Sequence, residues 1–140
     1  MYQCSREIVL DRPSPRGLHL PMAETKSLPA QFHDLERFVG AWALATQQQR
    51  NDKRVASSME ELRDFYGTLL ARIKDIATYL DQFPITALPA EAVNLLYLGQ
   101  MLMEIAPAVE VMKSPDIPSA YARERLIIHP QTEQFKKADA

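Results

Sequence analysis

The strongest constraint on the fold is a run of eight apolar residues whose spacing alternates between three and four positions. The run consists of Met59, Leu62, Tyr66, Leu69, Ile73, Ile76, Leu80 and Phe83. This spacing places every member on one side of an α-helix, whereas a half-buried strand would alternate every second residue. The same spacing is typical of helices that pack at shallow crossing angles, as they do in bundles.

Both ends of this helix carry recognisable signals. Ser58 is followed three residues later by Glu61, which is the pattern of a capping box, and Ser57 with Glu60 offers the same pattern one position earlier. Pro84 cannot continue a helix, because it lacks a backbone N–H and clashes with the preceding turn. We therefore expect a helix over residues 58–83.

Two further helices begin with a shared leucine-proline-alanine signal, in "SLPAQF" at 27–32 and "ALPAEA" at 87–92. Proline suits the first turn of a helix, where the missing N–H costs no helical hydrogen bond. The first of these helices is expected over about 29–54, and the second over about 89–112. Pro107 lies inside the latter and is expected to kink it.

Three helices joined by short connections predict an all-α, antiparallel up-and-down three-helix bundle over residues 28–113. Residues 1–27 are expected to form an extended or disordered arm, because four helix-breaking residues fall within it: Pro13, Pro15, Gly17 and Pro21. Residues 114–140 are expected to be a loop and a C-terminal tail. We also hypothesise that Met22 is the natural start of the protein.

Composition excludes several function classes. Sixteen basic residues against 18 acidic ones give a formal net charge of −2, without the clustered positive surface that nucleic acids or anionic membranes attract. Cys4 is the only cysteine, so no internal disulfide can form, which fits a reducing compartment. The N-terminus shows no signal-peptide pattern. We expect a cytoplasmic protein without nucleic-acid partners.

The segment from Asn94 to Met112 is apolar on almost every side. Counted from Ala92, the segment is about long enough to span a bilayer. Glu104 and Glu110 argue against a membrane, since a charge at the bilayer centre costs about 2.5–3.5 kcal/mol on insertion scales. A bundle of three helices cannot cover so broad an apolar arc, so we expect a homodimer that completes a larger bundle. In the alternative, the C-terminal tail folds back over the exposed flank.

At one height along the predicted bundle, polar side chains from different helices are expected to meet, and this region is a candidate ligand site. Counting residues from the predicted turns places Glu104 level with Thr46 to Arg50, where the apolar stripe of the first helix becomes polar and basic. A buried carboxylate needs a partner, and we expect Glu104 to meet Arg50, directly or across a dimer axis, because the planar guanidinium can bind a carboxylate through two bonds. The candidate residues are Trp42, Thr46, Gln49, Arg50, Tyr66, Tyr97 and Glu104. The alternative is a solvated or purely structural salt bridge.

No catalytic or metal-binding motif accompanies this level. The residue three positions after each glutamate in the predicted helices is never histidine, so the Glu-x-x-His pattern of di-iron bundles is missing, and we expect neither a metal nor another cofactor. Phosphate-loop and nucleophile-elbow motifs are also missing from the sequence, and no catalytic residue is assigned.

The sequence leaves open whether the protein is an enzyme. It favours a non-enzymatic interaction or accessory module that acts through homodimerisation, with a further protein partner. The alternative is a small-molecule-binding protein or simple enzyme that uses a polar pocket around Glu104 and Arg50. DNA binding has the least support, because the basic residues are spread along the chain.

Overall fold

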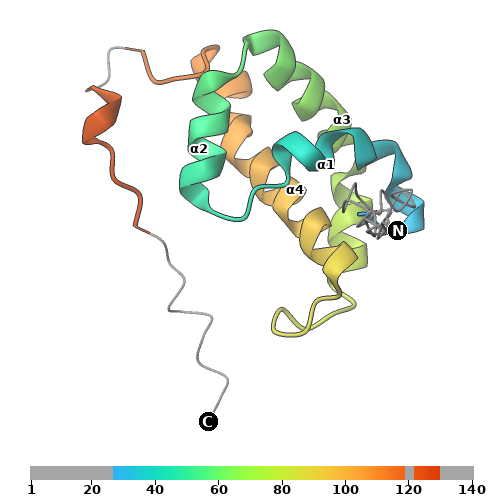
Figure 1. The fold of residues 1–140 in the computed structure, drawn as a ribbon. Helices are drawn as coiled ribbons and strands as arrows, with labels where there is room; N and C mark the ends of the chain where they lie inside the picture. The colour runs from blue at the N-terminus through green and yellow to red at the C-terminus, as the bar shows by residue number, and fades with distance from the viewer. Residues whose placement is uncertain (1–26, 119–121, 130–140) are drawn as a thin grey trace, which may run out of the picture.

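The computed structural model describes residues 27–118 and 122–129, and all regular structure within these ranges is helical (Figure 1). The all-α prediction is therefore confirmed for this part of the chain. The predicted N-terminal arm, Cys4 and Met22 lie outside the described residues, apart from Ser27. The elements in order are η1 (Ala30–Leu35), α1 (Glu36–Trp42), α2 (Gln47–Ala56), α3 (Met59–Leu80), α4 (Ala90–Pro107), η2 (Ala108–Met112) and η3 (Arg123–Arg125).

Helix α3 begins where its capping box predicts. The Ser58 hydroxyl accepts a hydrogen bond from the Glu61 backbone N–H at 3.2 Å, and the Glu61 carboxylate accepts one from the Ser58 N–H at 2.8 Å. Two otherwise unpaired backbone donors are thereby satisfied. Three members of the apolar run, Leu62, Leu69 and Ile76, are fully buried. The helix ends at Leu80, one turn before the predicted end.

Helix α4 starts after Pro89 and changes type at Pro107. The backbone continues as a π-helical segment, η2, which ends at Lys113 with a left-handed backbone (φ 54°). Proline removes one backbone donor and crowds the preceding turn, and a wider π turn is one way in which a helix adapts to such an interruption. The predicted irregularity at Pro107 therefore takes the form of a change in helix type.

The single helix predicted over 29–54 is wrong, because the structure divides it into η1, α1 and α2. Residues 43–46 between α1 and α2 are not helical. Thr46 is extended there (φ −107°, ψ 150°), and its hydroxyl and the Gln49 side chain form a reciprocal capping box with two 3.2 Å hydrogen bonds. This cap starts a new helix. The described residues consequently contain four α-helices instead of three.

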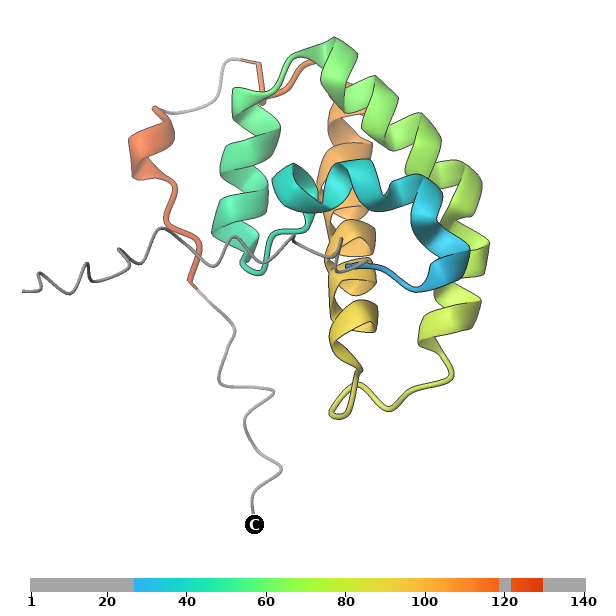
Figure 2. The ribbon, with the colours of Figure 1, turned by 45° about the vertical axis from the view of Figure 1, so that its right-hand side comes forward.

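Helix α4 is the centre of the arrangement and contacts α1, α2 and α3. Figures 1 and 2 both show α2 and α3 on opposite sides of α4, with α1 crossing the group on one face. The core lies where α1, α3 and α4 meet. Its buried apolar residues are Leu28, Phe32, Leu35, Phe38, Trp42, Leu62, Phe65, Leu69, Ile76, Leu95, Leu98, Met101, Leu102, Ile105 and Ala108.

Candidate functional site

The carboxylate of Glu104, on α4, is the centre of a polar network that faces α2. Its Oε1 accepts hydrogen bonds from Arg54 Nε and from Asn51 Nδ2, both at 3.1 Å. The side chain of Glu104 is 16% exposed and that of Arg54 is 7% exposed. At this depth an unpaired charge would be strongly unfavourable, so each group requires the other.

The network extends from α2 to the segment that follows η2. Arg54 Nη1 donates a hydrogen bond to the backbone carbonyl of Pro115. Arg123 Nη2 donates to Asn51 Oδ1 at 3.0 Å and also to the carboxylate of Asp52. The bonds from Arg123 and from Gln48 lower the pKa of Asp52. Helix α2 is thus joined by polar bonds to α4 on one side and to Pro115 and Arg123 on the other.

Arg50 does not form the predicted direct ion pair with Glu104 within the protomer. Arg50 Nη1 instead donates to the carbonyl oxygens of Leu44 and Ala45, at 2.9 and 3.2 Å, in the break between α1 and α2. Burial lowers the pKa of Arg50, while the nearby Glu104 and Tyr97 act in the opposite direction. The break shifts the register of α2, so that Arg54, one turn later, reaches the carboxylate.

The structure places three other candidate residues in local structural roles. Trp42 is buried in the core, where its ring stacks on Phe65 with 4.7 Å between the ring centroids. The Nζ atom of Lys53 lies 4.5 Å from the centroid of the Trp42 ring. Thr46 and Gln49 form the capping box of α2. The aromatic wall and the polar lining that the sequence predicted are not built from these residues.

Tyr66 belongs to a different contact. Its hydroxyl donates a hydrogen bond to the carboxylate of Glu110 in η2, and this bond raises the pKa of Tyr66. The contact joins the first half of α3 to the segment after α4. Of the seven candidates, the structure brings Arg50 and Glu104 into one cavity, with Tyr97 close enough to influence the charge of Arg50.

That cavity is a shallow groove between α2 and α4, widely open to solvent, with a volume of about 280 Å³. We call it the α2–α4 pocket, and its lining residues are Gln47, Arg50, Gln100, Met103 and Glu104. Sequence reasoning missed Gln47, Gln100 and Met103. Helical spacing was the available signal, because Gln47 lies three residues before Arg50 and Gln100 lies four before Glu104.

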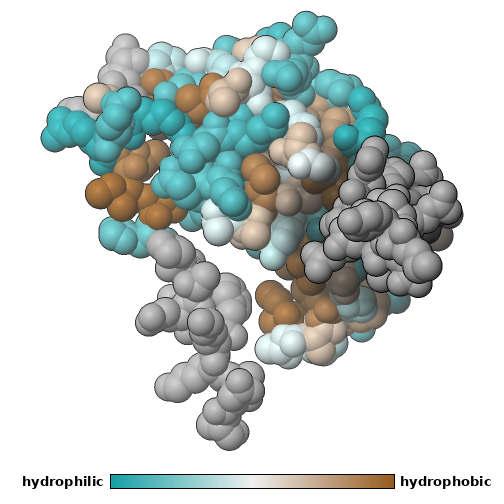
Figure 3. Space-filling view, in the orientation of Figure 1, coloured by the Kyte–Doolittle hydropathy of each residue, from teal (hydrophilic) through white to brown (hydrophobic). Residues whose placement is uncertain are grey.

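A second cavity, of about 410 Å³, lies between α2 and the segment around η3. Its lining mixes opposite charges with two large aliphatic side chains, and the residues are Gln48, Asp52, Arg123, Glu124, Leu126 and Ile127. Leu126 and Ile127 are exposed. Figure 3 shows apolar surface in this region at the left, and more apolar surface at the end of the molecule that holds the α3–α4 connection.

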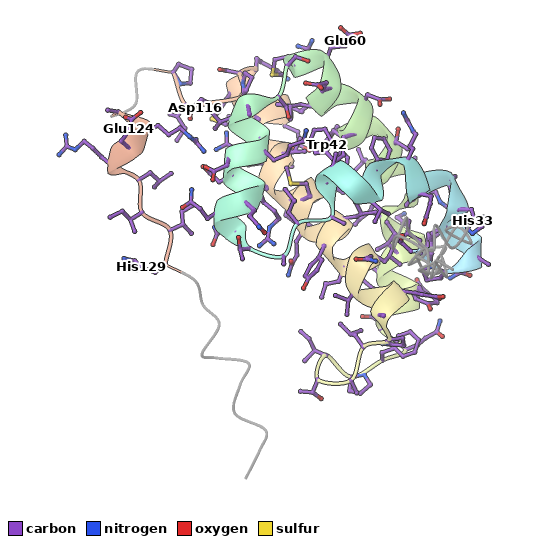
Figure 4. All side chains as sticks on the ribbon, in the orientation of Figure 1. His33, Trp42, Glu60, Asp116, Glu124 and His129 are labelled. Atoms are coloured by element: carbon purple, nitrogen blue, oxygen red, sulfur yellow. The ribbon has the colours of Figure 1, made fainter. Side chains whose placement is uncertain are left out.

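Within residues 27–118 and 122–129, no group of three or more histidine, cysteine, aspartate or glutamate side chains is placed to hold a metal ion. Figure 4 shows His33 and His129 on opposite sides of the molecule, so these two side chains cannot share a ligand. In the same ranges, one helical segment, Ala90–Met112, is long and apolar enough to cross a membrane by length and composition alone. One third of its most apolar window is buried inside the protein.

Comparison with known proteins gives no relative: no protein-family model, no curated protein and no solved structure matches this chain.

Proposed function

We propose that this chain is a non-enzymatic interaction module that forms a homodimer through the outer face of α4. We define this face by four residues whose spacing alternates between three and four: Leu96, Gly99, Met103 and Ala106. The face points away from the core residues Leu98 and Ile105, which lie on the opposite side of the helix.

The observation that carries the proposal is the exposure of Met103, whose accessibility is 65% in the middle of this face. Gly99 lies one turn earlier, and a Cβ added there would meet no atom within 4 Å. The same helix therefore presents a protruding side chain, Met103, and an open space above Gly99 into which such a side chain could pack. In a two-fold dimer, Met103 of each copy faces Gly99 of the other, and both apolar surfaces leave water.

The arrangement of the helices within the protomer is part of the proposal. The hydrogen bond between Tyr66, near the start of α3, and Glu110, just beyond α4, supports an antiparallel α3–α4 pair. On this basis the protomer resembles an up-and-down bundle whose first helix is broken, and dimerisation completes the cover of α4. We propose that a further protein partner binds the assembled dimer, without nucleic acid or membrane, in the cytoplasm. The balanced charge supports the exclusion of nucleic acid.

Sedimentation velocity of the full chain across micromolar concentrations tests the homodimer. Met103→Glu places a charge in the proposed interface, and Ile85→Glu is the matched control, because Ile85 is equally exposed at 65% but lies in the α3–α4 connection. We expect Met103→Glu to weaken the dimer by at least about tenfold, which corresponds to about 1.4 kcal/mol. Ile85→Glu should leave the dimer unchanged.

Gly99→Leu provides an independent variant. Leucine is a good helix former and meets no atom of its own protomer at the added Cβ, so the fold should persist while the space for Met103 is filled. A wild-type chain that sediments as a monomer at every concentration would overturn the proposal. Equal losses in Met103→Glu and Ile85→Glu would overturn the assignment of the interface to α4.

A further inference from the structure

Two opposite charges line the α2–α4 pocket without neutralising each other. Glu104 is held by Asn51 and Arg54 through Oε1, and Arg50 is held by two backbone carbonyls through Nη1. Each charge is therefore fixed by groups outside the pocket. Glu104 shares its charge with Arg54, whereas Arg50 is held by carbonyl groups, and neither side chain has to be ordered by an incoming ligand. Such fixed groups are preorganised for binding.

Both charged groups retain unused hydrogen-bonding capacity. The two bonds that Glu104 accepts end on the same oxygen, which leaves Oε2 to accept from a ligand. A guanidinium carries five N–H donors, and the two carbonyl bonds of Arg50 engage only Nη1, so Nη2 and Nε remain. The amide groups of Gln47 and Gln100 add both donors and acceptors to the lining.

We propose that the α2–α4 pocket binds the zwitterionic head of a small α-amino acid. The ligand carboxylate lies against the guanidinium of Arg50, in the planar geometry that arginine favours, and the ligand ammonium donates to Oε2 of Glu104. A simple anion could bond to Arg50 but not to Glu104, and a simple cation could bond to Glu104 but not to Arg50, so each would make only half of the contacts. A cavity of about 280 Å³ has room for a short side chain beside Met103.

The site is a property of the single protomer, because all five lining residues come from α2 and α4 of the same chain. Met103 is the one residue that belongs both to the pocket and to the outer face of α4, so the variants that test the pocket leave it unchanged.

Amide chemical-shift titration of the full chain by NMR tests the proposal, with L-alanine as the zwitterionic probe. Propionate lacks the ammonium group and ethylamine lacks the carboxylate, so these two fragments are matched controls. We expect saturable shifts at Gln47 and Gln100 with a Kd of about 1 mM for L-alanine. Each fragment should bind at least about tenfold more weakly. Shifts that never saturate, or fragments that bind as well as L-alanine, would overturn the proposal.

Single substitutions test whether Glu104 and Arg50 bind the two charged groups of the ligand. Glu104→Gln retains a side-chain acceptor for Arg54 and Asn51 but removes the charge, so we expect a native amide spectrum and at least tenfold weaker binding of L-alanine. Arg50→Gln should have the same effect on binding. If Arg50→Gln fails to fold because the carbonyls of the α1–α2 break lose their donor, Arg50→Lys decides in its place, because lysine keeps a donor for those carbonyls but lacks the planar fork, and we expect it to bind L-alanine more weakly. Gln48→Leu, which alters the other cavity, is the control. Unchanged affinity in Glu104→Gln would overturn the assignment.

Discussion

Replacing Glu104 by alanine removes the acceptor that holds α2 against α4. Arg54 would keep its bond to the Pro115 carbonyl but would lose its counter-charge while remaining almost fully buried, at 7% exposure. Removing one partner of a buried ion pair costs about 3–5 kcal/mol. Because Glu104 is 16% exposed and water can reach the vacated space, we expect the lower end of this range, about 3 kcal/mol.

Urea unfolding followed by far-ultraviolet circular dichroism measures this loss. For a chain of this size, the dependence of the unfolding free energy on urea is roughly 1–3 kcal/mol per molar, so the midpoint should fall by about 1–3 M with an unchanged slope. All variants are compared at one protein concentration, since any dimerisation contributes to the apparent stability.

Two companion variants separate hydrogen bonding from charge. Glu104→Gln keeps one acceptor for both donors but removes the counter-charge of Arg54. A cost of about 1 kcal/mol would show that hydrogen bonding dominates the contact, whereas a cost equal to that of Glu104→Ala would show that the charge dominates it. The double variant Arg54→Met with Glu104→Leu replaces the pair by apolar groups and should recover to within about 1 kcal/mol of the wild type. A loss below about 1 kcal/mol for Glu104→Ala would refute the reasoning that a buried, mutually dependent pair fastens the two helices.

Three further predictions concern α3 and its neighbours. Gly67→Ala should raise the free energy of unfolding by about 0.5–1 kcal/mol, because an added Cβ meets no atom within 4 Å; an unchanged or lower melting temperature would contradict this. The pKa of Tyr66 is raised by Glu110, so the contact stabilises the fold below the ordinary pKa of 10.0 and is lost as the pH rises through the folded-state pKa. When the wild type and Tyr66→Phe are titrated spectrophotometrically, the wild type should show one additional phenol, and the pKa of that phenol should lie above 10.0. Hydrogen bonds from Ser58 lower the pKa of Glu61, so the stability that they contribute is present above the unfolded-state pKa and lost as the pH falls through the folded-state value. Ser58→Ala should move the pKa of Glu61 upward in an NMR titration.

The elements that could be predicted are those whose signals are local. The capping box of Ser58 and Glu61 and the apolar run behind it placed the start of α3, and Pro89 placed the start of α4. The break between α1 and α2 also has a local signal, since Thr46 and Gln49 repeat the capping-box pattern. It was overlooked because no glycine or proline stands between residues 41 and 56 to interrupt the helical pattern.

The polar centre could be predicted only in part. A partner for Glu104 follows from the cost of burying a carboxylate, and an arginine on the preceding polar helix follows from geometry. The choice between Arg50 and Arg54 depends on the register of α2 after the break, and a shift of one turn is enough to exchange them. The contributions of Pro115 and Arg123 arise from long-range folding of the segment after η2, which no periodicity in the sequence encodes.

The attachment of α2 has a consequence for how the molecule moves. The buried residues of α2 are Asn51 and Arg54, so this helix is fastened to the body by hydrogen bonds and charge, whereas α3 and α4 are joined by aliphatic and aromatic side chains. Segments with few buried apolar contacts open at a lower free energy than the global fold. We therefore expect α2 to open at a lower free energy than α3 and α4, and in that open state the carboxylate of Glu104 would exchange its protein partners for water.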